Sequence, residues 1–134
     1  MIRLILLYLT VGLLLTIFLA APLLGAPGDP WERAIIARVA SEYSLTPHQT
    51  KLLQAIRMAE AGGAGLEFGV AQYQPRHPAR QYVAFPERSL QVQAKWAAGT
   101  IKKRYRGDLD AFAKRYVASP KAGAWVHNVK HHMR

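Results

Sequence analysis

One acidic residue, Glu60, stands where general acid–base chemistry requires a carboxyl group. It ends a predicted helical segment in which Leu52, Leu53 and Ile56 form an apolar stripe, and it falls on that stripe one turn after Ile56. Partial burial and the negative end of the helix macrodipole both disfavour the carboxylate. A carboxyl group that stays protonated near neutral pH can act as a general acid. The spacing by itself also fits a solvated glutamate at a frayed helix end.

The sequence around Glu60 favours the catalytic interpretation. Residues 55–63 read Ala-Ile-Arg-Met-Ala-Glu-Ala-Gly-Gly, and residues 67–72 read Glu-Phe-Gly-Val-Ala-Gln. Together they resemble the catalytic core of the lysozyme-like lytic transglycosylases, which pair a helix-terminal Glu, a small residue and Gly with a downstream Gly-x-x-Gln element. Residues 112–116 and 125–129 are similar to the C-terminal helices of that family, in which a tyrosine, here Tyr116, faces the catalytic glutamate.

The resemblance implies cleavage of the β-1,4 glycan strands of peptidoglycan with Glu60 acting alone. Glu60 would protonate the glycosidic oxygen and then take a proton from the 6-hydroxyl of the same sugar, which leaves a 1,6-anhydro product. The resemblance further implies that Glu67, Gly69, Gln72 and Tyr116 help to hold the substrate. It implies a small, all-α, lysozyme-like domain, and no cofactor or metal is expected.

Two alternatives remain open from the residues alone. Hydrolysis would require a second carboxylate, as nucleophile or as the base that activates water. Glu67 is the nearby candidate, but it follows three glycines in a segment that we expect to be flexible, whereas Asp108 and Asp110 are expected to cap a helix. The second alternative is a non-catalytic, basic module that binds the cell envelope.

The charge of the chain predicts an anionic partner. The 134 residues carry a net charge of +10, and Arg3 is the single basic residue before residue 27. Such a surface would attract anionic lipid, acidic envelope polymers or nucleic acid. The sequence contains no cysteine, so a disulfide framework and a thiolate metal site are excluded. His127 and His131 share a helix face but lack an acidic third ligand nearby, so we predict no metal site there.

Residues 1–26 form an expected signal peptide or membrane anchor. After a basic start at Arg3, residues 4–24 are apolar without a charged interruption, and this run is about long enough to span a bilayer. The cleavage motif before residue 27 is not clean, because Leu24 occupies its outer position. We therefore expect an exported protein, either anchored at the membrane facing the periplasm or envelope, or secreted. Because an exported domain meets little DNA, nucleic acid is not an expected partner.

The remainder, residues 29–134, is predicted to be one monomeric domain. Helices are expected from Asp29, with Glu32 closing a capping box, from Thr46 to Glu60, and over about residues 87–105, 109–117 and 121–133. On the third of these Trp96 lies off the apolar stripe, and we expect a second layer to bury it. The alternative is that Trp96 faces a ligand. Residues 68–86 lose the helical period and include a short hairpin at most. Their aromatic and basic side chains, Tyr73 among them, would suit a glycan groove. They fit a solvated loop, whose charges keep it soluble, equally well.

Deletion of residues 1–26 should leave a soluble, folded domain, because the predicted anchor is separate from the apolar stripes of the helices. Membrane fractionation of the full chain and thermal unfolding of the truncated chain test this prediction. Recovery of the full-length native protein at full mass in the soluble cytoplasmic fraction would refute it.

Overall fold

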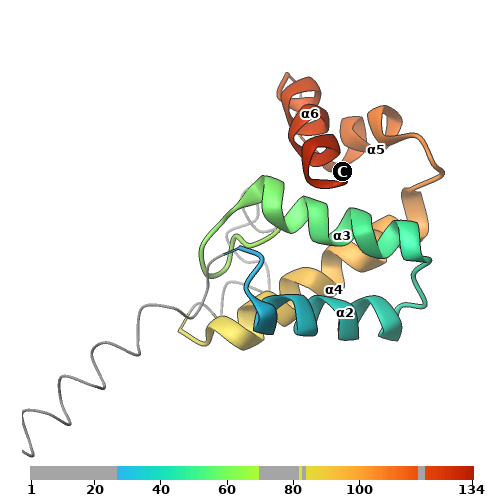
Figure 1. Cartoon of the computed structure of the whole chain (residues 1–134). Helices are drawn as coiled ribbons and strands as arrows, with labels where there is room; N and C mark the ends of the chain where they lie inside the picture. The colour runs from blue at the N-terminus through green and yellow to red at the C-terminus, as the bar shows by residue number, and fades with distance from the viewer. Residues whose placement is uncertain (1–26, 70–81, 83, 118–119) are drawn as a thin grey trace, which may run out of the picture.

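The computed structural model describes residues 27–69, 82, 84–117 and 120–134, and in these residues it is all-helical. The helices are α2 (Pro30–Glu42), α3 (Pro47–Glu60), α4 (Pro86–Arg104), α5 (Leu109–Tyr116) and α6 (Ala122–His132) (Figure 1). The predicted all-α class is confirmed for this part of the chain. The expected anchor at residues 1–26 and the possible hairpin after residue 69 lie outside it. None of the helices described here has the length and apolar character needed to cross a membrane.

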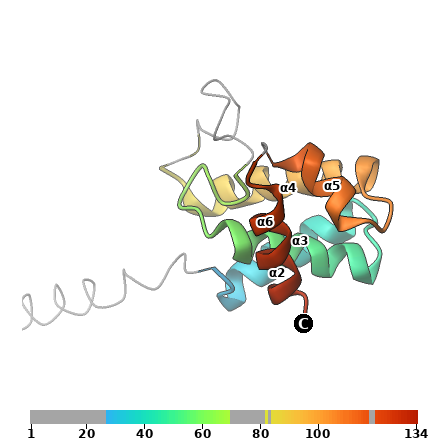
Figure 2. The same cartoon turned by 90° about the horizontal axis from the view of Figure 1, so that it is seen from above.

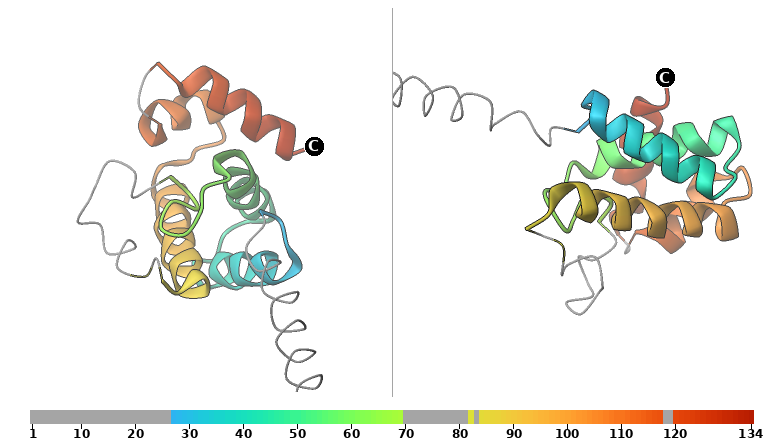
Figure 3. Two further views of the ribbon diagram at one scale, coloured as in Figure 1. Left: turned by 90° about the vertical axis from the view of Figure 1, so that its left-hand side faces the viewer. Right: turned by 90° about the horizontal axis from the view of Figure 1, so that it is seen from below.

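Helix α3 is at the centre of the domain. It contacts α2, α4 and α6, while α2 packs along α4 and α5 packs on α6. Figure 2 shows α6 running across α3, and the left panel of Figure 3 shows α3 between α6 and the α2–α4 pair. Helix α3 is therefore in contact with helices from both halves of the chain. The C-terminal end carries Glu60.

The predicted apolar stripes form the core. Leu52, Leu53 and Ile56 of α3 are fully buried, and so are the stripe residues of α4, which are Leu90, Ala94, Ala97 and Ile101. The expectation that Trp96 is buried is wrong, because 48% of its surface is exposed. The inner stripe of α4 already packs on α2 and α3, and Trp96 lies on the outer side of the helix.

The three predicted N-cap positions, at Asp29, Thr46 and Asp108, are confirmed, but the predicted capping box at the start of α2 is wrong. Thr46 and Gln49 make the reciprocal hydrogen bonds of a capping box at the start of α3, and Asp108 Oδ1 accepts from Ala111 N at 3.0 Å at the start of α5. At the start of α2, Asp29 makes no side-chain cap. Glu32 does not close a capping box there, because its carboxylate pairs with a residue of α3.

That partner is Arg57, and the pair is buried. Arg57 Nε donates to Glu32 Oε2 at 3.0 Å and Nη2 donates to Oε1 at 2.8 Å, and each residue is 2% exposed. The remaining Arg57 nitrogen, Nη1, donates to the carbonyl oxygens of Gly62 at 2.9 Å and Glu67 at 3.3 Å. This fork-to-fork geometry joins α2, α3 and the loop after α3 at one point.

We predict that Glu32→Ala lowers the free energy of unfolding by about 3–5 kcal/mol, because it leaves the Arg57 charge buried and unpaired. Glu42→Ala is the matched control on the same helix. Glu42 pairs with Lys95 at 2.9 Å, but both side chains are 39% exposed, so its loss should cost less than about 1 kcal/mol. Urea denaturation measures both values, and equal losses for the two variants would contradict the central role of the buried pair.

Candidate functional site

The loop that follows α3 turns back toward Glu60. Ala61 ends the helix in the left-handed region, with φ 47°, and its N–H donates to the carbonyl of Arg57. Gly62 follows, where an added Cβ would lie 2.0 Å from the carbonyl oxygen of Leu66. A side chain at position 62 is therefore excluded by the backbone, which explains one of the glycines in this run.

Two polar side chains of α4 hold the same loop from the other side. Ser89 Oγ accepts from Gly65 N at 2.7 Å, and Gln93 Nε2 donates to Gly65 O at 3.0 Å while its Oε1 accepts from Phe68 N at 3.4 Å. Both side chains are fully buried. They are one helical turn apart, so a single face of α4 satisfies the backbone polar groups of the loop.

Glu67 belongs to this buried network. It is 3% exposed, and its Oε2 accepts from Gly65 N at 2.9 Å. Burial raises the pKa of the Glu67 carboxyl, and hydrogen bonds, the first of them with Ser89, offset part of that rise. The expectation that Glu67 is loosely held in a flexible segment is wrong. The glycines before it allow a tight turn whose polar interior is closed by α4.

Glu60 has a different environment. It is partly buried at the end of α3, and its Oε1 accepts from Trp125 Nε1 of α6 at 2.7 Å. Desolvation raises the pKa of the Glu60 carboxyl, and the hydrogen bond from Trp125 lowers it in part. None of the ion pairs formed within the described residues includes Glu60. The carboxyl group is thus held in place by a neutral donor that is compatible with either protonation state.

Aromatic rings from α5 and α6 form a wall beside Glu60. The ring of Tyr116 lies 5.3 Å from that of Trp125 and 5.3 Å from that of Phe112, centroid to centroid. The Tyr116 hydroxyl donates to the carbonyl of Phe68 at 3.0 Å. Burial, and secondarily the charge of Glu60, raise the pKa of Tyr116, so it remains a neutral hydrogen-bond donor.

Gly69 lies against the second oxygen of Glu60. A Cβ at position 69 would be 2.7 Å from Glu60 Oε2, and the residue has φ +67°, which favours glycine. Thus Oε1 is occupied by Trp125, whereas Oε2 faces a position that lacks a side chain. Glu60, Gly69, Tyr116 and Trp125 form a closed arrangement from four separate elements, because Tyr116 in turn holds the carbonyl next to Gly69.

The structure brings together three of the predicted site residues, namely Glu60, Gly69 and Tyr116. It places Glu67 in the loop interior, and Gln72 and Tyr73 lie outside the described residues. Sequence reasoning missed Trp125 as the partner of Glu60 and missed the buried Arg57. The available signal for Trp125 was its place in the segment that resembles a C-terminal family helix, but no local pattern connects it to Glu60.

Comparison with models of known protein families, with curated proteins and with solved structures found no match for this chain.

The raised pKa of Glu60 predicts a specific dependence of stability on pH. Folding raises this pKa above the usual value of 4.5, so the folded protein binds more protons than the unfolded chain between the two pKa values. The free energy of unfolding contributed by Glu60 therefore falls as pH rises through that window. The stability gain of Glu60→Gln over the wild type should grow from about pH 4 upward and level off above the folded pKa.

Trp125→Phe keeps an aromatic ring but removes the donor that favours the carboxylate, so the pKa of Glu60 should rise further and the window should extend to higher pH. Chemical denaturation across a pH series and NMR titration of the Glu60 carboxyl carbon measure both effects. Two results would contradict this account. One is a difference in unfolding free energy between Glu60→Gln and the wild type that does not vary with pH, and the other is an unchanged Glu60 pKa in Trp125→Phe.

Proposed function

We propose that the chain is a lysozyme-like lytic transglycosylase that cleaves the β-1,4 glycan strands of peptidoglycan. The observation that carries the proposal is the state of Glu60. It is a single carboxyl group at a helix end, its pKa is raised by burial, and Trp125 fixes one of its oxygens. A general acid near neutral pH needs a raised pKa and a fixed position.

The proposed reaction uses Glu60 twice. Oε2, on the side of Gly69, protonates the glycosidic oxygen as the bond from that oxygen to C1 of the sugar breaks. The 6-hydroxyl of the same sugar then attacks C1 and returns its proton to the Glu60 carboxylate. The new bond closes a 1,6-anhydro ring, no water is consumed, and Glu60 ends protonated as it began.

The position of Glu67 supports one carboxylate rather than two. A hydrolase would need a second carboxylate across the scissile bond from the acid. Glu67 is the nearest acidic residue in sequence, but it is buried and its carboxylate accepts from the backbone of Gly65. Hydrolysis through Glu60 and Glu67 would require this network to open, so we favour the anhydro route.

The other proposed substrate contacts follow from the resemblance. Gly69 lies against Glu60, where any side chain would collide with the carboxyl group, and Tyr116 shapes the wall that borders it. Gln72 and Tyr73 are proposed to contact the glycan from the segment after Gly69. In this proposal the predicted anchor at residues 1–26 keeps the domain at the envelope, where its polymer substrate lies.

The test is digestion of purified peptidoglycan followed by mass spectrometry of the released fragments. We expect products that are lighter than the corresponding reducing-end fragments by one water. Glu60→Gln should stay folded and lose cleavage, because the amide cannot donate and accept the proton. Glu67→Gln should lose activity only in part, through a weakened loop.

Glu42→Gln is the matched control, since it changes a solvent-exposed glutamate of α2 and should keep the wild-type rate. Wild-type cleavage by Glu60→Gln would exclude Glu60 as the acid. Products with free reducing ends only, together with an inactive but folded Glu67→Gln, would assign the reaction to a hydrolase with two carboxylates.

A further inference from the structure

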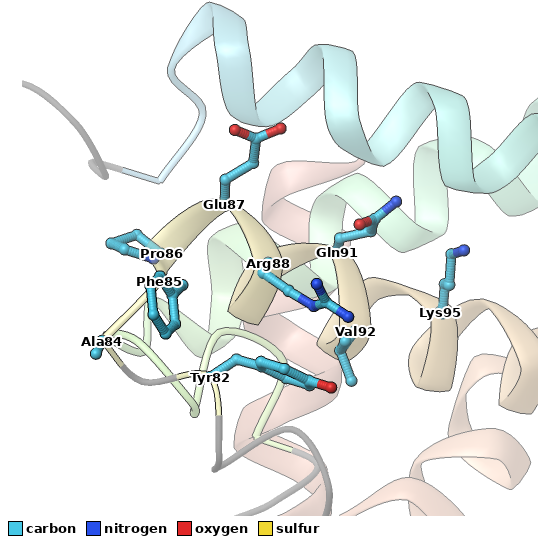
Figure 4. A pocket seen from close by; sticks show the side chains of 9 residues that line it. All are labelled: Tyr82, Ala84, Phe85, Pro86, Glu87, Arg88, Gln91, Val92 and Lys95. Carbon is cyan, nitrogen blue, oxygen red and sulfur yellow. The ribbon is translucent and has the colours of Figure 1, made fainter.

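The outer side of α4 carries two adjoining hollows. One, of about 720 Å³, is lined by residues that include Phe85, Arg88 and Val92 (Figure 4), and the other, of about 550 Å³, by residues that include Trp96 and Lys103. Val92 and Lys95 line both. Arg88, Val92, Lys95, Gly99 and Lys103 recur at helical spacing, so the two hollows follow one face of the helix.

This face concentrates exposed aromatic surface. Phe85 is 63% exposed and Trp96 is 48% exposed, and they are the two large hydrophobic side chains exposed within the described residues. They are separated by 11 positions, which corresponds to about 16 Å along a helix. A third ring, Tyr82, lies under the Arg88 guanidinium, whose central carbon is 4.7 Å from the ring centroid. Two exposed rings on one face are typical of a binding surface.

The charges on this face are mainly positive. Arg88, Lys95, Lys103 and Arg104 line the hollows, and Glu87 is the acidic residue among their lining side chains. Gln91 adds an amide. Lys95 is partly neutralised by its contact with Glu42, but the other three cations leave a positive balance. Exposed rings suit the apolar faces of sugars, and guanidinium and ammonium groups suit carboxylates.

We propose that the outer face of α4 is a second binding surface, which takes a carboxylate-bearing glycan strand of peptidoglycan. The proposal rests on the proposed function for the identity of the polymer, but the two surfaces share no residue. The two exposed rings lie about 16 Å apart along the helix, farther than one sugar ring extends, which favours a strand over a small ligand. The same stretch of α4 carries aromatic rings, which would contact the faces of the sugars, and cations, which would pair with the acidic peptides on the strand.

The test uses the full chain carrying Glu60→Gln, so that strands stay intact, in detergent and with isolated cell-wall sacculi as the probe. Trp96→Ala should weaken binding in a pelleting assay about tenfold through loss of ring contact. Lys103→Ala with Arg104→Ala should weaken it about threefold to tenfold, with a larger effect at low salt. Amidation of the sacculus carboxylates should abolish the effect of the Lys103 and Arg104 substitutions and leave the effect of Trp96→Ala unchanged.

The matched control is Lys114→Ala with Arg115→Ala. It also removes two exposed basic residues from the last turn of a helix, but from α5. It should bind like the parent chain, and since every variant keeps the same leader, any contribution of residues 1–26 cancels. Circular dichroism melting verifies that all variants are folded.

The proposal is overturned if Trp96→Ala binds like the parent chain, or if the control weakens binding as much as the α4 pair does. The outcome is separable from the proposed function. If the wild type fails to cleave while the α4 variants lose binding, the chain is an envelope-binding module and the surface assignment stands. If the wild type cleaves while the α4 variants bind normally, the surface assignment fails and the enzymatic proposal is unaffected.

Discussion

The buried ion pair between Glu32 and Arg57 is the constraint on which the arrangement around Glu60 depends. Arg57 is three residues before Glu60, and its guanidinium binds α2 through two parallel hydrogen bonds and the loop through two carbonyls. Burying both charges is unfavourable unless each is fully paired. The pair therefore selects a single position for the end of α3, because any shift of that helix end would leave a charge unpaired in the interior.

Two glutamates within eight positions acquire different properties from their surroundings. Both pKa values are raised by burial. Glu67 faces a polar interior made by Ser89 and the loop backbone, and its carboxylate stabilises the turn by accepting hydrogen bonds there. Glu60 instead accepts a hydrogen bond from Trp125 at one oxygen, and its other oxygen lies against Gly69. Separation of two carboxyl groups by environment is a general way to assign them separate roles.

Much of the fold was predictable because its signals are local. The Thr46 cap, the end of α3 at Glu60, the Asp108 cap and the buried stripe of α4 each depend on residues within a few turns of one another. The site was predictable only in part. Glu32 fits a local cap by its spacing from Asp29. No sequence pattern indicates that it pairs with Arg57, which lies 25 positions away. Glu67 was expected to be mobile because the polar side chains that close over it come from α4.

The long sequence separations between the residues around Glu60 determine at what stage of folding this arrangement can form. Trp125 and Glu60 are 65 positions apart, and Tyr116 and Phe68 are 48 apart. Contacts of such long range form only after the intervening chain has been ordered. A chain in which α6 has not yet docked has neither the indole donor nor the ring wall beside Glu60. The surroundings of Glu60 are thus completed by α6, so a partly folded or C-terminally shortened protein lacks this arrangement.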